Sequence, residues 1–295
     1  MTRRFLCLAA LSATFAATFV GTPAHAEPAE DRAAALVAEV ARLGNDPRGL
    51  GALAELREVL PDVGLAARRR LLTPLQKAKL HPLTRAQLTL ESAALDVASG
   101  DRAEANARLR AGGWALDWEL VGPLQGGPGA ITAPLGPELD PAGPYAGRHG
   151  EVGWRALGDR THLGAVDPQS LVRPMDNSLA YARTSVRRAR ASKETVRIAA
   201  RGPYQVFLNG ALLGGRAEGA GTDPFTWVDT DAFAVALPAG DSVILVKLSG
   251  EEGACEFALR LTSDRADTPQ TLLGGAAKSP RDLARAALLA RRMLP

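Results

Sequence analysis

The spacing of apolar residues divides the chain into a helical part and a β part. Between Ala29 and Leu43 apolar side chains recur every three or four residues, which places them on one face of a helix. Similar spacing, interrupted by glycine, proline and aspartate, predicts further helices over 51–60, 65–79, 85–98 and 102–110. We therefore expect α-helical hairpins over residues 27–113.

Beyond Trp114 the helical spacing gives way to alternation of apolar and polar residues, which is typical of half-buried strands. The predicted strands are 118–121, 179–189, 194–200, 204–208, 233–237, 242–248 and 256–262. The segment 122–147 is rich in glycine and proline and is expected to form long loops rather than helix. Short strands separated by turns favour an antiparallel β-sandwich over a parallel sheet.

Two turns indicate how neighbouring strands connect. Asn209 and Gly210 stand between apolar flanks, and a type I′ hairpin needs a positive φ at both central positions, which this pair readily adopts. We therefore predict a structural turn at Asn209-Gly210. A second turn, Pro238-Ala239-Gly240, precedes the nearly continuous apolar run 242–248. Such a run is typical of a strand in the middle of a sandwich.

The tail contains one further helix signal. Ser279 is a favourable cap, Pro280 suits the first helical position and Asp282 suits the first turn. The predicted fold class is thus α+β and multidomain. Its parts are a signal peptide at 1–26, a helical segment at 27–113, a β-sandwich at 114–264, and a linker with a C-terminal helix at 265–295.

The first 26 residues have the pattern of a secretory signal peptide. Arg3 and Arg4 precede an apolar run over 5–20, and Ala24-His25-Ala26 is a small-x-small cleavage site. The apolar run has at most about 16 residues, fewer than the roughly 20 that a membrane-spanning helix needs. We expect cleavage after Ala26, no transmembrane span afterwards, and a periplasmic or extracellular location.

Charge argues against a nucleic-acid partner. The formal net charge is +3, and Arg3 and Arg4 supply two of these charges, so the chain beyond residue 26 has no strong positive field. Arg187, Arg188, Arg190 and Lys193 form a basic cluster, but no aromatic residue interleaves with them. Stacking platforms for bases are therefore not expected there.

Cysteine and histidine are scarce. Cys255 is the one cysteine beyond residue 26, so no internal disulfide is expected, and its alternating apolar surroundings favour a strand residue over a nucleophile. The four histidines show no metal-ligand spacing, and His149 and His162 lie in glycine-rich loop sequence. Nucleophile-elbow, phosphate-loop and zinc-protease motifs are missing from the sequence. No metal, cofactor or enzymatic activity is expected.

Aromatic residues are concentrated in the β part. Apart from three phenylalanines in the first 26 residues, every aromatic residue lies between Trp114 and Phe257. Trp114, Trp118 and Trp154 are expected to anchor the helical part to the sandwich.

Several short motifs in the β part occur in a familiar order. They are Trp118–Pro123, Gly136–Asp140, Trp154, Ala180–Thr184, Val206–Gly210, Pro238–Gly240 and Val243–Lys247. This order resembles the β-sandwich segment that accompanies tetratricopeptide repeats in large exported bacterial proteins, and it is similar to galactose-binding-like, carbohydrate-binding-type jelly rolls. The resemblance covers residues 114–264 and implies a jelly-roll-like fold. It says little about function, because one fold hosts many functions.

The segment from Leu90 to Ala105 resembles one tetratricopeptide-type helical hairpin. The small residues Ala93, Ala94, Ala98 and Ser99 allow close helix packing, and Gly100-Asp101 makes the turn. The full 34-residue pattern with its early Trp and Tyr is missing, so a generic helical hairpin is the alternative.

The best candidate for ligand binding is the loop over 215–231. It holds Asp223, Phe225, Trp227 and Asp229, and sugar rings pack on aromatic faces while acids bind their hydroxyls. Trp227 as a core residue is the alternative. We expect a non-catalytic exported envelope protein that binds a protein or a glycan. The alternative is a glycan-active hydrolase with carboxylates in the sandwich loops, among Asp223, Asp229, Asp231, Glu251 and Glu252.

Overall fold

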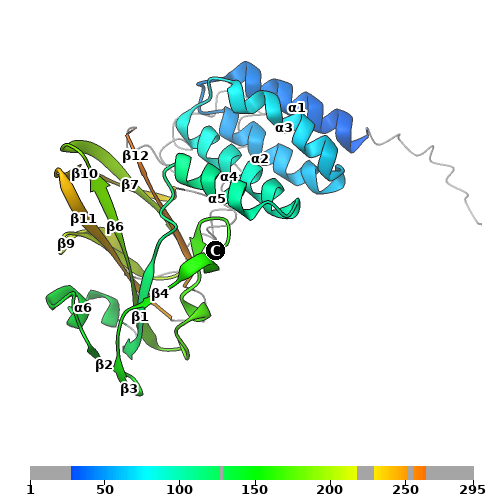
Figure 1. Ribbon diagram of the computed structural model, residues 1–295. Helices are drawn as coiled ribbons and strands as arrows, with labels where there is room; N and C mark the ends of the chain where they lie inside the picture. Colours follow the sequence, from blue (N-terminus) through cyan, green and yellow to red (C-terminus); the bar gives the residue numbers. More distant parts are fainter. Residues whose placement is uncertain (1–27, 127–128, 218–228, 251–254, 264–295) are drawn as a thin grey trace, which may run out of the picture.

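The computed structural model describes residues 28–126, 129–217, 229–250 and 255–263. It confirms the α+β architecture, since helices precede two antiparallel sheets in the chain. In Figure 1 the helices, coloured blue to cyan, form one lobe and the strands, coloured green to orange, form the other. The predicted signal peptide and C-terminal helix lie outside the described residues.

The helical lobe is built from α1 (Ala29–Leu43), α2 (Gly49–Val59), α3 (Leu65–Lys77), α4 (Pro82–Ala98) and α5 (Arg102–Ala111), with a 3-10 turn at Leu60–Asp62. Helix α1 packs on α2 and α3, and α4 packs on α2, α3 and α5. Leu53, Leu56, Leu72 and Leu75 are fully buried in this lobe. The periodic apolar residues of the sequence thus face one another, as the helical spacing predicts.

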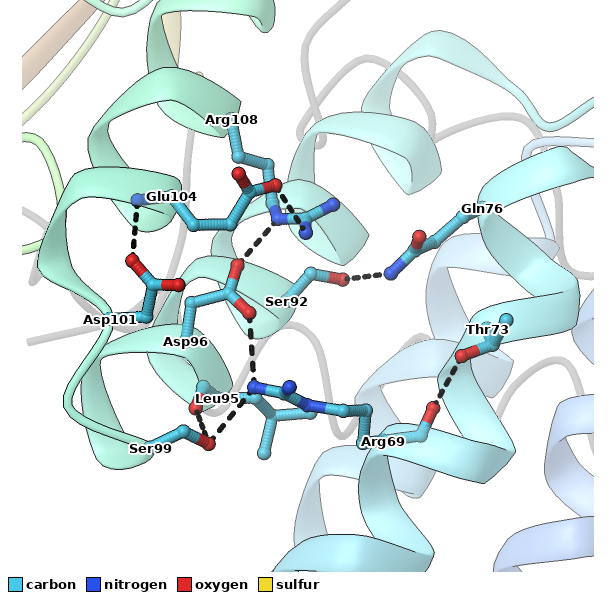
Figure 2. A network of polar contacts seen from close by, with 10 residues as sticks. All are labelled: Arg69, Thr73, Gln76, Ser92, Leu95, Asp96, Ser99, Asp101, Glu104 and Arg108. Carbon is cyan, nitrogen blue, oxygen red and sulfur yellow. Dashed lines mark hydrogen bonds and ion pairs between the residues drawn. The ribbon is translucent and has the colours of Figure 1, made fainter.

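The predicted α4–α5 hairpin is confirmed. Asp101 caps α5, and its Oδ1 accepts a hydrogen bond from the backbone N–H of Glu104 at 2.9 Å. Near this turn Asp96 accepts hydrogen bonds from Arg69 of α3 and Arg108 of α5 (Figure 2). Three helices therefore share one carboxylate at the end of the hairpin.

Two helix predictions need correction. Helix α4 begins at Pro82 and not near Arg85, because proline is well suited to the first turn and His81 Nδ1 caps the helix by accepting from Leu83 N–H at 3.4 Å. The segment 122–147 was expected to contain no helix, yet α6 (Gly136–Leu139) forms one turn there. Pro137 stands near its start, where a missing N–H costs nothing.

Two antiparallel sheets form the sandwich. The larger, eight-stranded sheet has the order β3-β2-β1-β6-β11-β8-β9, with β4 paired to β1. Its strands are β1 (Glu119–Gln125), β2 (Tyr145–Gly147), β3 (Gly150–Val152), β4 (Arg155–Ala156), β6 (Ser178–Arg188), β8 (Tyr204–Leu208), β9 (Ala211–Arg216) and β11 (Gly240–Ser249). The smaller sheet, β10-β7-β12-β5, contains β5 (Ala165–Val166), β7 (Ser192–Ala200), β10 (Asp231–Leu237) and β12 (Phe257–Thr262).

The main core lies between the two sheets. Trp118 packs edge-on against Phe257, with ring centroids 4.9 Å apart, and both are buried. The apolar run of β11 lies between β6 and β8, in the middle of the larger sheet, as predicted. Residues of β11 that point inward, such as Ile244 and Val246, are fully buried.

The first strand was predicted to end at Val121, and this is wrong. Strand β1 continues to Gln125 through Gly122-Pro123, and its register against β6 shifts between Val121 and Leu124. A bulge of this kind accommodates a proline that cannot donate to the ladder. The strand signal was hidden because glycine and proline usually end strands.

The Asn209-Gly210 turn is confirmed. The φ angles are 49° and 82°, and Leu208 pairs directly with Ala211, so two residues join β8 to β9. Asn209 does more than turn the chain. Its Oδ1 accepts from Val243 N–H at 2.8 Å, and its own N–H donates to the Val243 carbonyl at 2.9 Å, which fastens the turn to β11.

The helical lobe joins the smaller sheet through residues 113–115. Ala115 N–H donates to the Leu259 carbonyl at 3.0 Å, and Leu261 N–H donates to the Gly113 carbonyl at 2.9 Å. Trp114 packs with Leu90 and Leu109 of the helices, so its predicted anchoring role is confirmed. Anchoring roles for Trp118 and Trp154 are wrong, since Trp118 lies in the sandwich core and Trp154 packs at the outer face of the larger sheet.

Candidate ligand-binding site

The loop predicted to bind a ligand is described only at its two ends, residues 215–217 and 229–231. Asp223, Phe225 and Trp227 lie outside the described residues. Asp229 is 2% exposed, and both its oxygens accept from the guanidinium of Arg260, the Nε–Oδ1 distance being 2.7 Å. The Arg260 guanidinium also lies over the ring of Trp114, 5.2 Å from its centroid. The structure therefore places the Asp229 carboxylate at the junction of the sandwich and the helices.

Asp231, another carboxylate considered for hydrolysis, is paired as well. Its Oδ2 accepts from Arg216 at 2.8 Å and from the Tyr204 hydroxyl at 2.7 Å. Burial, with the nearby carboxylate, raises the pKa of Tyr204, which keeps this hydroxyl protonated as a donor. Glu251 and Glu252 lie outside the described residues.

A cleft of about 350 Å³ opens beside β1, β3 and β4 of the larger sheet. We call it the Trp154 cleft. It is lined by Gly122, Pro123, Glu151, Val152, Gly153, Trp154, Arg155, Leu171 and Arg173. One aromatic ring, three charged side chains and two aliphatic side chains thus surround a space within the usual size of a small-ligand site.

The indole of Trp154 is held by contacts with Tyr145, Pro141 and Arg183. Its indole N–H donates to the Tyr145 hydroxyl and to the Pro141 carbonyl, each at 3.0 Å. The Arg183 guanidinium lies 4.2 Å from the centroid of the indole ring, and the Tyr145 ring stands perpendicular at 6.2 Å. These contacts fix the orientation of the indole without a ligand, which reduces the entropy that binding would cost.

The charged side chains that line the cleft are exposed and make few hydrogen bonds within the protein. Arg155 Nη2 donates to the Gly122 carbonyl at 3.2 Å, and Arg173 Nε donates to the Gln169 carbonyl at 2.8 Å. Each guanidinium has further N–H groups, which are donors for the hydroxyl or carbonyl oxygens of a ligand. Glu151 is exposed and supplies acceptor oxygens on the same rim.

A buried ionic cluster holds this side of the sandwich in place. The Lys247 ammonium, with a fully buried side chain, donates to Glu138 Oε1 at 2.8 Å and to the Ala133 carbonyl, and the Tyr181 hydroxyl donates to the same Glu138 oxygen. Burial lowers the pKa of Lys247 and raises that of Tyr181. The cluster fastens residues 130–140 to the sheet, and Tyr145, which orients Trp154, packs in the same outer core.

This cleft is not predicted by the sequence pattern. The available signal is a tryptophan followed by arginine within a glycine-rich segment, and an anchoring role explains the same residues. What brings Glu151 and Trp154 next to Arg173 is the continuation of β1 through Gly122-Pro123, which the pattern did not indicate.

Other candidate chemistries find little support in the described part of the chain. There, no group of three or more His, Cys, Asp or Glu side chains is placed to hold a metal ion. No described helix is long and apolar enough to cross a membrane. Cys255 was predicted to lie in a strand, but it precedes β12, which begins at Phe257. It is 1% exposed, and burial raises the pKa of its thiol to about 12, which argues against a nucleophilic role.

Neither a protein-family model nor a curated protein sequence matches this chain. Among solved structures, it is similar to a family 35 carbohydrate-binding module from Clostridium thermocellum, with 16% identity and a TM-score of 0.24 over 29% of this chain and 72% of the module. A PA14 sugar-binding domain from an RTX adhesin shows 20% identity and a TM-score of 0.18 over 29% of this chain and 46% of that domain. A β-glucosidase from Kluyveromyces marxianus shows 19% identity and a TM-score of 0.25, with 41% of this chain covering 15% of the enzyme. Because these TM-scores are low, the fold assignment rests on the strand pairing described above.

Proposed function

We propose that this chain is an exported, non-catalytic envelope module whose β-sandwich binds a glycan in the Trp154 cleft. The observation that carries the proposal is the fixed tryptophan beside Glu151, Arg155 and Arg173. An aromatic face packs against the C–H face of a sugar ring, and the charged groups bind its hydroxyls.

Binding is favoured over hydrolysis by the charges at the cleft. Glycoside hydrolysis normally uses two carboxyl groups on either side of the scissile bond. Among the residues that line the cleft, Glu151 is the one carboxylate. Asp229 and Asp231 are engaged with arginines on other parts of the sandwich.

Export is proposed from the sequence of residues 1–26 and has a direct test. The mass of the protein recovered from its producing cells is expected to correspond to a chain that begins at Glu27. A recovered chain that retains residues 1–26 would refute the proposal.

Glycan binding is tested on an array of immobilised glycans that includes peptidoglycan fragments. We expect the full chain to retain at least one glycan, and Trp154→Ala to weaken that binding at least tenfold. Because Trp154→Ala also removes contacts with Tyr145 and Arg183, the exposed variants Glu151→Gln and Arg173→Ala provide a second test with little effect on folding. Arg190→Ala, an exposed change that is not at the cleft, is the matched control.

Two results would overturn the proposal. One is a folded chain that retains no glycan. The other is a glycan whose affinity is unchanged in Glu151→Gln, Arg173→Ala and Trp154→Ala together.

A further inference from the structure

Strand β6 has a free edge along its second half. The chain before β1 pairs with β12 of the smaller sheet at residues 113–115, whereas β1 itself pairs with β6 of the larger sheet. The pairing of β1 with β6 ends at Glu119 and Arg183. Residues 184–188 continue along β11, and no described strand pairs with them on the β1 side.

The register shows which backbone groups face this free edge. Val243 exchanges hydrogen bonds with Asn209 on the β8 side of β11, so its N–H and C=O point away from β6. Val243 lies opposite Ser185, which makes this a non-hydrogen-bonded pair of the β11–β6 ladder. The backbone groups of Ser185 therefore point away from β11, and those of Arg187 do so two residues later.

Three of these four backbone groups have no partner in the described chain. The carbonyl of Arg187 accepts from Arg188 Nη1 at 3.2 Å. The N–H and C=O of Ser185 and the N–H of Arg187 face a cleft of about 280 Å³ between β6 and residues 113–117. A row of unpaired backbone groups of this kind is a template for another strand.

The side chains around this second cleft are mainly basic. Arg110, Arg187 and Arg188 line it together with Asp117. Arg110 pairs with Asp117 at 2.9 Å and Arg187 with Asp241 at 3.8 Å, but all four side chains are at least half exposed. Such exposed pairs contribute little, so an incoming carboxylate can replace these partners. Arg188 is held more firmly, through Nε and Nη2 to Glu194 at 2.5 and 2.7 Å.

We propose that the free edge of β6 at residues 184–188 binds an extended acidic peptide segment of a partner protein as an added strand. Backbone hydrogen bonds to Ser185 and Arg187 hold the segment, and its carboxylates pair with Arg110 and Arg187. Five residues of strand span about 17 Å, which matches a short linear segment. This proposal does not depend on glycan binding at the Trp154 cleft.

The probe is a fluorescent seven-residue peptide in which glutamate alternates with valine, and its lysine counterpart is the charge control. Fluorescence anisotropy with the full chain is expected to show binding of the glutamate peptide that weakens with added salt. The lysine peptide is expected to bind at least tenfold more weakly.

Two pairs of variants separate backbone pairing from charge. Ser185→Pro removes an N–H that does not serve the β11 ladder, so the fold is kept while binding falls at least tenfold, whereas Ser185→Ala retains binding. Arg187→Glu is expected to weaken binding at least tenfold, and its control Arg190→Glu to leave it nearly unchanged. Bound peptide is also expected to slow amide hydrogen exchange at Ser185 and Arg187.

Equal binding of the two peptides, or no binding of either, would refute the proposal. So would a glutamate peptide that binds without slowing exchange at Ser185 and Arg187, which would indicate charge attraction without strand pairing. The exchange measurement and Arg187→Glu decide the matter if Ser185→Pro fails to fold.

Discussion

The helical lobe and the sandwich junction each bury an aspartate against arginine, and they do so in different surroundings. In the helical lobe the Asp96 side chain is 9% exposed, but its partners Arg69 and Arg108 are 54% and 25% exposed. At the junction, Asp229 and Arg260 are only 2% and 7% exposed. The first site is open to water on one side, whereas the second is sealed.

The contribution of an aspartate–arginine pair to stability depends on how deeply the pair is buried. At an open site, water and salt weaken the attraction, and losing one partner leaves the other solvated. At a sealed site, removing one partner leaves a charge without solvent, which is far more costly than the pair itself is stabilising. We therefore expect the stability of the junction to depend strongly on Arg260.

The largest effect on stability is expected for Arg260→Met, which leaves the buried Asp229 carboxylate without its cationic partner. The free energy of unfolding should fall by about 3–5 kcal/mol, measured by urea denaturation. The double variant Asp229→Asn with Arg260→Met, in which no buried charge remains, should recover part of this loss. A loss below about 1 kcal/mol in the single variant would show that the site is not sealed.

A smaller effect is expected for Asp96→Ala in the helical lobe. The variant loses hydrogen bonds to two arginines that reach water, so we expect a loss of about 1–2 kcal/mol in the same measurement. A loss as large as that of Arg260→Met would contradict the distinction between the two sites.

Gly210 in the sandwich turn can be compared with Gly64 in the helical lobe. Gly210 has a φ of 82°, Gly64 at the start of α3 has a φ of −61°, and a Cβ at either position would meet no atom within 4 Å. Gly210→Ala should therefore destabilise by about 1 kcal/mol through backbone strain alone. Gly64→Ala, at the N-cap of α3 where the negative φ is open to any residue, is the control and should carry no such backbone strain. Equal thermal stability of the two variants would argue against the turn geometry.

The smallest effect concerns pH. Hydrogen bonding from Arg188 lowers the pKa of Glu194 below its ordinary value of 4.5. A lowered pKa in the folded state means that this group stabilises above pH 4.5, and that the contribution is lost as pH falls through the folded pKa.

The variant Glu194→Gln isolates this effect. The difference in unfolding free energy between wild type and Glu194→Gln should be less than about 1 kcal/mol at pH 7 and should shrink below pH 4.5. Urea denaturation at pH 3 to 7 measures it. A difference that stays constant over this range would show that Glu194 does not contribute through its charge.

The order of the elements and several of their ends follow from local patterns in the sequence. Helical spacing located α1 to α5, alternation located most long strands, and Asn209-Gly210 predicted a turn that the structure contains. These features depend on residues close in the chain, because periodicity and turn conformation are local properties.

The sites depend on contacts between segments that are far apart in the chain. Trp154 meets Arg183 because β4 and β6 both pair with β1 at Glu119. It shares a cleft with Arg173 that Gly122 and Pro123 of β1 also line. Likewise, the apolar pattern around Lys247 does not predict its ion pair with Glu138, which lies 109 positions away in the chain.

The free edge of β6 arises in the same way. It exists because the chain passes from the smaller sheet at Ala115 to the larger sheet at Glu119. Pairing partners and burial depend on which distant segments share space, and a hydrophobic pattern specifies the face that a residue occupies but not the neighbour that it meets.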